Sequence, residues 1–304
     1  MDSEAPKRVA REATTMPWFR ALARLGYVSS GIVHALIGVI ALIVALGGDA
    51  ATDQTGALRA IAALPLGFTL LWIIAAGFFA LAAWKIGEGI LVRGDSDLKK
   101  WGGRVGQWCQ AVVFAAFGAV AAAIALGARL SSEQAAEKAS RGVLDISGGT
   151  FLLIAVGIGV GATGISFLSM GVRRSYRTRV SVPVGALGRL VDILGIVGFV
   201  AKGVALAAMA VLLVIAAVRD EAATAGGLDG ALAALLGLTL GPVLVASIGI
   251  GFIAYGVFCL FRARYARLSP DPARHASRRT SSLENRRTPA GSPHVRSGND
   301  TRHG

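Results

Sequence analysis

The sequence contains few of the residues on which enzymes and metalloproteins depend. Among 304 residues there are two Cys and four His, and only 16% of the residues are charged. Three of the histidines, His275, His294 and His303, lie near the C-terminus without the spacing of metal ligands. The run GVGATG at positions 159–164 matches the dinucleotide pattern G-x-G-x-x-G, but it lies inside an apolar stretch and not at a strand–helix turn. We therefore expect no catalytic residues, no cofactor, no metal site and no enzyme activity.

Charge is also nearly absent from six long apolar stretches, and this absence indicates the fold class. Each stretch has about 20 residues or more, which at about 1.5 Å per residue is enough to cross a hydrocarbon core of about 30 Å. The sequence therefore predicts an all-α integral membrane protein with six transmembrane helices. The predicted helices cover Gly26–Leu46, Phe68–Val92, Gln107–Ala128, Phe151–Val172, Ile193–Val218 and Leu236–Leu260.

The basic residues lie mainly on one side of these helices. Leaving aside the C-terminal tail, the segments before the first helix and after the second, fourth and sixth carry 17 Lys and Arg, whereas the three segments on the other side carry five. Because Lys and Arg concentrate on the cytoplasmic side of membrane proteins, we expect both termini in the cytoplasm. We expect the protein itself to lie in the bacterial plasma membrane. The net charge of +13 requires no nucleic acid partner, since anionic lipid headgroups attract the same residues.

Three similar segments indicate that the chain is built from repeats. Each segment begins with a small residue and an Arg and ends on a Gly: ARLGYVSSGIVHALIG (23–38), GRVGQWCQAVVFAAFG (103–118) and GRLVDILGIVGFVAKG (188–203). The even-numbered helices share a pair of glycines ten residues apart: Gly67 and Gly77, Gly149 and Gly159, Gly241 and Gly251. Two helices return the chain to its starting side, so all three repeats have the same orientation. A pseudo-threefold bundle of three two-helix repeats is the simplest closed packing.

The repeats resemble the domain of unknown function 1206 family of mainly actinobacterial multi-pass membrane proteins. The resemblance is carried by the Arg-x-Gly opening of the repeats, by LRAIAALPLG (58–67) and by LLWIIAAGFFALAAW (70–84). It implies an architecture and no catalytic residues. We place the repeats at residues 18–93, 94–174 and 175–267, after a cytoplasmic segment at 1–17. Residues 268–304 are rich in Arg, Ser and Pro, and we expect a disordered cytoplasmic tail there.

Two ionisable residues break the symmetry of the repeats near the middle of the membrane. His34 corresponds to Phe114 and Phe199 in the other repeats, and Lys202 corresponds to Ile37 and Phe117. When the repeats are aligned, Lys202 lies three positions beyond the position of His34. Residues three apart lie on one face of a helix, so His34 and Lys202 occupy equivalent faces of their two helices and can point into a shared interior space. Such a pair is a candidate proton relay or anion site. The alternative is structural, with His34 bonded to a backbone carbonyl or Ser30 and Lys202 reaching toward the interface.

Other charged residues have simpler interpretations. Lys85 and Glu88 are three residues apart on one helix and are expected to form a structural charge pair. Asp192 and Arg189 have the same spacing and the same expected pairing. Arg24, Arg104 and Arg189 occupy equivalent positions at the start of the three repeats, where they are candidate contacts for lipid phosphate or for an anion ring.

The sequence favours a non-enzymatic membrane protein with a structural role or a role in binding lipid or protein. Its partners would be the bilayer, anionic headgroups, and a second copy of the chain or another membrane protein. The alternative function is transport of a small solute or ion, coupled to protons, with His34 and Lys202 in a site between the repeats at the middle of the membrane.

Overall fold

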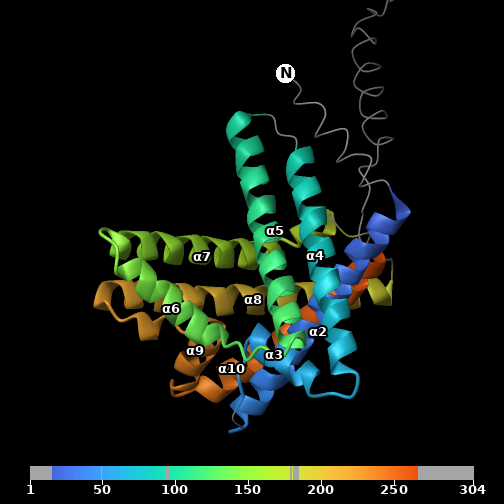
Figure 1. Cartoon of the computed structure of the whole chain (residues 1–304). Helices are drawn as coiled ribbons and strands as arrows, with labels where there is room; N and C mark the ends of the chain where they lie inside the picture. The colour runs from blue at the N-terminus through green and yellow to red at the C-terminus, as the bar shows by residue number, and fades with distance from the viewer. Residues whose placement is uncertain (1–15, 49, 93–95, 179, 181–184, 266–304) are drawn as a thin grey trace, which may run out of the picture. The chain divides into compact units, whose positions relative to one another are not determined.

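The computed structural model describes residues 16–48, 50–92, 96–178, 180 and 185–265 (Figure 1). Six helices in this part of the chain are long and apolar enough to cross a membrane. They are α2 (Pro17–Ala45), α4 (Gly67–Leu91), α5 (Asp97–Ala125), α7 (Gly149–Val172), α8 (Ala186–Arg219) and α10 (Gly241–Tyr265). The predicted all-α fold with six membrane-spanning helices is therefore confirmed. The predicted disordered tail at 268–304 lies outside the described residues.

A short helix that the apolar pattern did not predict joins the two long helices of each repeat. These connecting helices are α3 (Gln54–Ala62), α6 (Ser132–Leu144) and α9 (Gly227–Leu236), and two 3₁₀ turns, η1 (Ser175–Thr178) and η2 (Ala222–Thr224), complete the described helical segments. Polar caps begin two of them, because the Asp53 carboxylate accepts from the backbone N–H of Gly56 at 2.7 Å and the Ser131 hydroxyl accepts from that of Gln134.

A glycine at one equivalent position determines where the first long helix of a repeat ends. Gly47 follows α2 with φ +91° and Gly127 follows α5 with φ +90°, a left-handed conformation that favours glycine and ends a helix. The equivalent position in the third repeat is Leu212, and α8 continues past it to Arg219. As a result α8 has 34 residues, whereas α2 and α5 have 29 each.

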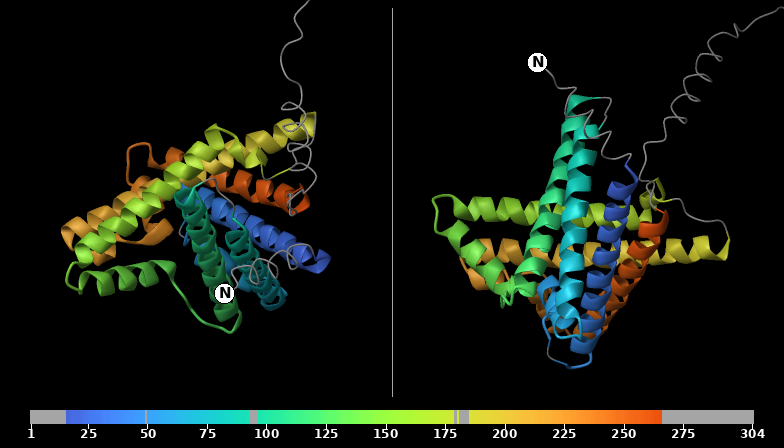
Figure 2. Two further views of the ribbon diagram at one scale, coloured as in Figure 1. Left: turned by 90° about the horizontal axis from the view of Figure 1, so that it is seen from above. Right: turned by 45° about the vertical axis from the view of Figure 1, so that its right-hand side comes forward.

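The closest helix pairs join different repeats. The second long helix of one repeat packs against the first long helix of the next, in the pairs α4 with α5, α7 with α8, and α10 with α2 (Figures 1 and 2). Within repeats, α2 packs on α4 and α8 packs on α10. Among the described residues, α5 and α7 make at most marginal contact. The three pairs follow the cyclic order expected of a pseudo-threefold arrangement of repeats, but the predicted closed packing is interrupted in the second repeat, where α5 and α7 barely touch.

Equivalent glycines lie at all three pairs between repeats. A Cβ added to Gly38 would lie 2.5 Å from the backbone oxygen of Gly249 on α10, and one added to Gly203 would lie 2.8 Å from that of Gly164 on α7. At α4 and α5 the contact differs, because Gly118 faces the ring of Phe79 at 3.2 Å. In lipid, helices associate through such close van der Waals contact, which small residues permit.

The connecting helices also contact one another across the repeats. Thr55 of α3 hydrogen-bonds with Ser132 of α6, and α6 packs on α9. The Asp229 carboxylate of α9 accepts hydrogen bonds from both the backbone N–H and the hydroxyl of Thr52, at 2.6 Å each. The three short helices therefore form a ring that holds the repeats together on the side opposite the repeat starts.

Large apolar side chains remain exposed on the outer surfaces of the long helices. Phe151, Val112 and Ile158 expose 80%, 69% and 64% of their surface. A soluble domain rarely exposes contiguous apolar surface of this extent, whereas a bilayer solvates it. The protein is therefore a multi-pass membrane protein whose long helices contact lipid.

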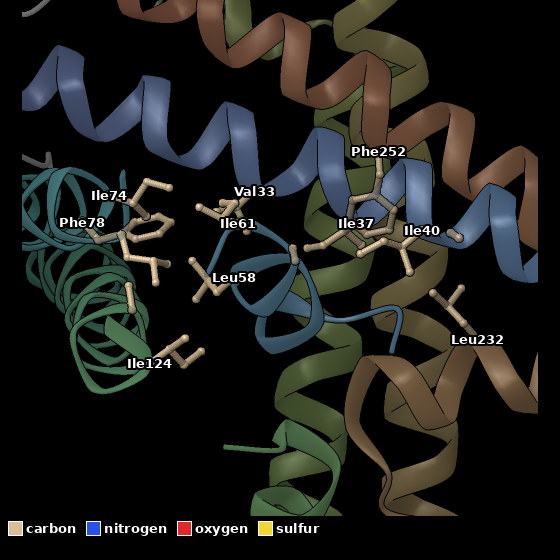
Figure 3. Packing of buried hydrophobic residues seen from close by; sticks show 14 of the residues in the cluster. Val33, Ile37, Ile40, Leu58, Ile61, Ile74, Phe78, Ile124, Leu232 and Phe252 are labelled. Carbon is tan, nitrogen blue, oxygen red and sulfur yellow. The ribbon is translucent and has the colours of Figure 1, made fainter. Parts of the chain in front are cut away.

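The main apolar core lies where α2, α3, α4 and α10 meet. Figure 3 shows Val33, Ile37 and Ile40 of α2 facing this cluster together with Phe252 of α10. Leu58 and Ile61 of the connecting helix α3 enter it from one side. Leu58 is fully buried, so this short helix contributes to the core as well as linking two spans.

Candidate functional site

His34 lies one turn from this core, in the interior of the helix assembly. Its side chain is 4% exposed. The ring nitrogen Nδ1 lies 2.7 Å from the backbone carbonyl oxygen of Ser30, one turn earlier on α2. Its ring centroid lies 5.9 Å from that of Phe252 and 4.8 Å from that of Tyr255, both on α10. A carbonyl oxygen only accepts hydrogen bonds, so Nδ1 carries a proton and Nε2 of the neutral ring is left as an acceptor.

Lys202 of α8 reaches that acceptor. Its Nζ lies 3.0 Å from Nε2 of His34. The ammonium also lies over two aromatic rings, 4.5 Å from the centroid of Tyr255 and 5.1 Å from that of Phe167 on α7. Aromatic faces stabilise a cation, and this effect is stronger where water is absent. The structure thus brings together two of the residues singled out in the sequence, from the first and third repeats.

A hydrogen-bonded pair of this kind can share a proton. Lys202 donates to His34 when it is an ammonium, and the same proton can move along this hydrogen bond to give a neutral amine and an imidazolium. Both arrangements have a single positive charge distributed over two residues. A site of this kind can take up or release a proton without a metal or a carboxylate.

The second repeat shows what the fold places at the His34 position when no proton is involved. Phe114 stacks on Phe78 at a centroid distance of 6.2 Å, between α5 and α4. His34 makes the equivalent contact with Phe252 between α2 and α10. The imidazole therefore occupies a position that elsewhere holds a phenyl ring, in the same stacking arrangement.

Lys85 and Glu88 are paired in the structure. Lys85 is only 2% exposed, and its Nζ donates to Oε2 of Glu88 at 2.5 Å and to Oε1 of Gln107 on α5 at 3.2 Å. Glu88 is also close enough to Arg262 of α10 to interact with its charge. A buried charge is tolerated where it is paired and hydrogen-bonded. The contacts with Glu88 and Gln107 therefore explain why the Lys85 ammonium can be buried between α4 and α5.

The three arginines at the repeat starts lie on three different helices. Arg24 and Arg189 are exposed, and the guanidinium of Arg104 lies 5.5 Å from the ring centroid of Trp101. Exposure at these positions leaves two of the three arginines accessible to lipid headgroups. Their binding of lipid phosphate or of another anion stays a prediction.

The expected pairing of Asp192 with Arg189 was wrong. Asp192 is instead held by η1, where Arg177 donates to its carboxylate and the Tyr176 hydroxyl donates to its backbone oxygen at 3.0 Å and its Oδ1 at 3.3 Å. Tyr176 is buried and stacks on Phe199 at 5.5 Å. Burial, followed by the nearby Asp192 carboxylate, raises the pKa of the Tyr176 hydroxyl to about 12. The partner comes from η1, the turn between α7 and α8, which spacing along α8 could not indicate.

Sequence reasoning also missed three aromatic residues of the site. Tyr255 and Phe167 hold the Lys202 ammonium, and Tyr27 lies under the guanidinium of Arg262 at 4.4 Å. A signal for one of them was present, because Tyr255 corresponds to Leu81 and Thr163 in the other repeats and so breaks the symmetry as His34 does. Aromatic residues inside apolar helices are otherwise indistinguishable from ordinary core residues.

Comparison with known proteins agrees with the repeat architecture. The chain is 26% identical over 273 residues to "Uncharacterized protein YxxB" of Bacillus subtilis (strain 168), a match that covers 84% of this chain and 94% of that protein. No solved structure matches the chain. The model of the family described as Domain of Unknown Function (DUF1206) matches three successive ranges, 25–91, 105–174 and 197–266. Because these ranges together cover more than half of the chain, the protein belongs to the DUF1206 family.

Proposed function

We propose that the protein is a non-enzymatic transport protein in which the His34–Lys202 pair takes up and releases a proton, coupled to the movement of a small solute or ion. We further propose that it resides in the bacterial plasma membrane with both termini in the cytoplasm, as the distribution of basic residues indicates. The observation that carries the proposal is the 3.0 Å contact between Nζ of the half-buried Lys202 and Nε2 of the buried His34, both on membrane-spanning helices.

The repeats provide the argument against a purely structural role for this pair. The equivalent of His34 is Phe in both other repeats, and the equivalents of Lys202 are Ile37 and Phe117. The fold therefore assembles with apolar residues at these positions, and apolar residues avoid the free-energy cost of about 2.5 kcal/mol or more for a charge at mid-membrane. The chain has an energetically costly pair at positions where the fold accepts Phe and Ile. This supports a functional role for His34 and Lys202 over a purely structural one.

The test uses the residues of the other repeats as substitutions. The purified protein is reconstituted in liposomes of phosphatidylethanolamine and phosphatidylglycerol on a solid-supported electrode, and a rapid pH step is the probe. We expect a transient charge displacement in the wild type that is lost in His34→Phe and in Lys202→Ile. Thermal unfolding in detergent provides the control, because both variants should remain folded. An unchanged charge displacement in both variants would exclude the proposed proton site.

The second candidate is a structural protein that binds lipid or a membrane protein and no transported ligand. It is favoured by the glycine contacts at the three pairs between repeats and by the lipid-facing apolar surface of α5 and α7. In this case the partner is an anionic lipid, a second copy of the chain or another membrane protein. The two candidates separate in the same experiment, since a structural protein tolerates His34→Phe and Lys202→Ile without any change in charge displacement.

A further inference from the structure

Polar side chains continue from the His34–Lys202 pair in one direction only. They lie on successive turns of α2, α10 and α4 toward the face where the repeats begin. We call this set the polar ladder, and it consists of Ser30 and Tyr27 of α2, Tyr255, Cys259 and Arg262 of α10, and Lys85 and Glu88 of α4.

Contacts connect the members of the polar ladder. Oγ of Ser30 lies 3.4 Å from Nδ1 of His34, and the Cys259 side chain interacts with Ser30 and with Tyr255. One turn further, Arg262 lies over the ring of Tyr27 and interacts electrostatically with Tyr255, Cys259 and Glu88. Glu88 is the outermost member, with 37% of its side chain exposed. The polar ladder thus runs from a buried imidazole to a carboxylate at the surface.

The opposite direction from His34 is apolar. The next turns of α2 contribute Ile37 and Ile40, which pack with Phe252, Leu58, Ile61 and Leu232 (Figure 3). Ile37 is fully buried, and Leu58 and Leu232 expose 1% or less. We call these six residues the apolar plug. None of their side chains can donate or accept a proton, so the plug interrupts any hydrogen-bonded path to the other face.

We infer that the His34–Lys202 pair exchanges its proton only with the face where the repeats begin, along the polar ladder, while the apolar plug closes the other face. This inference rests on the proposed function, because it assumes that the pair is a proton site. The titratable and charged groups that face His34 from the surrounding helices are Lys202 of α8, Tyr255, Cys259 and Arg262 of α10, Tyr27 of α2 and Glu88 of α4.

Proton movement through the site balances at every atom. For release, a proton passes from Nζ of Lys202 to Nε2 of His34, the Nδ1 proton passes to the Ser30 hydroxyl, and that hydroxyl gives up its own proton past Cys259 and Tyr255 to water at the face where the repeats begin. The imidazole is then neutral with its proton on Nε2, and Lys202 is a neutral amine. Uptake reverses each transfer and restores the proton on Nδ1 and the ammonium. No ring rotation is required between the two states.

The first experiment tests the sidedness directly in the unmodified protein. Proteoliposomes are prepared in two populations of uniform, opposite orientation, and the pH step is applied to the outer face of each. We expect a charge displacement only when the step reaches the face where the repeats begin. A displacement from both faces, or only from the opposite face, would overturn the inference. No displacement from either face would remove the proposed function itself.

The second experiment opens the plug. In Ile37→Ser we expect a steady proton leak, followed with pyranine inside the liposomes, at least about fivefold above the wild type, because a hydroxyl bridges the apolar constriction. The matched control is Phe117→Ser, the equivalent position in the second repeat, which should not leak. Adding His34→Phe or Ser30→Ala to Ile37→Ser should return the leak to the wild-type level. A leak that persists in both double variants shows that the proton bypasses the ladder and contradicts the inference.

Discussion

The pair α10 with α2 and the pair α4 with α5 occupy equivalent places in the repeat architecture and differ in chemistry. Phe114 stacks on Phe78 in one, and His34 stacks on Phe252 in the other, at centroid distances of 6.2 and 5.9 Å. The stacking arrangement is thus shared by these two pairs, and the nitrogen atoms of His34 are an addition to it. The difference shows that a polar site was introduced here without a change in the packing of the helices.

The two pairs also differ in how closely their backbones approach. Gly38 of α2 faces the backbone of Gly249, and Gly31 faces that of Gly256, both on α10. Gly118 of α5 instead faces the side chain of Phe79. Backbone-to-backbone contact makes the pair around His34 less able to adjust, which holds the imidazole at a defined position against α10.

The largest expected effect tests this difference in packing. In Gly38→Ala the new Cβ would lie 2.5 Å from a backbone oxygen that cannot move without shifting α10, so we expect a loss of about 2–3 kcal/mol of stability. In Gly118→Ala the Cβ would lie 3.2 Å from a ring that can rotate, and the expected loss is under about 1 kcal/mol. Thermal unfolding in detergent with a tryptophan fluorescence readout compares the two variants. Equal losses would show that the two pairs are equally adaptable.

A smaller effect is expected from moving the polar residue into the other pair. Phe114→His places an imidazole against Phe78 without a lysine partner, and the unpaired polar ring should cost about 1–3 kcal/mol of stability. The matched control is the double variant His34→Phe/Lys202→Ile, which removes the pair without leaving either residue unpaired and should leave stability unchanged or raise it. Both variants are compared by thermal unfolding. If Phe114→His is neutral, the α4–α5 pair already accommodates a polar ring and the comparison between the pairs fails.

The third pair, α7 with α8, has a polar contact of its own, between α8 and Tyr176 of the turn η1 that joins the two helices. Its pKa is raised to about 12 from an ordinary value near 10, so the neutral hydroxyl is the form that the folded state favours. The stabilising contribution is therefore complete below about pH 10 and is lost as the pH rises toward 12. We expect a steeper fall in unfolding temperature between pH 10 and 12 for the wild type than for Tyr176→Phe. Parallel curves for the two proteins would show that the Tyr176 hydroxyl does not contribute to the pH dependence of stability.

The long helices could be predicted from the sequence because hydrocarbon selects strongly against charge over about 20 residues. Repeat equivalence also indicated that His34 and Lys202 share one face, and the structure places their nitrogens in contact. The connecting helices escaped prediction, because a nine-residue segment such as Gln54–Ala62 is too short to show a reliable period. The partner of Asp192 escaped for another reason, since Arg177 reaches it from a turn outside the helix.

The missing glycine at Leu212 has a consequence for the surrounding lipid. At about 1.5 Å per residue the 34 residues of α8 measure about 51 Å, against about 44 Å for the 29 residues of α2 and of α5. A bilayer of one thickness cannot match both lengths, so the third repeat must incline further or project beyond the headgroups. Hydrophobic mismatch therefore acts unequally on the three repeats, and the repeat that supplies Lys202 is the one most exposed to changes in membrane thickness.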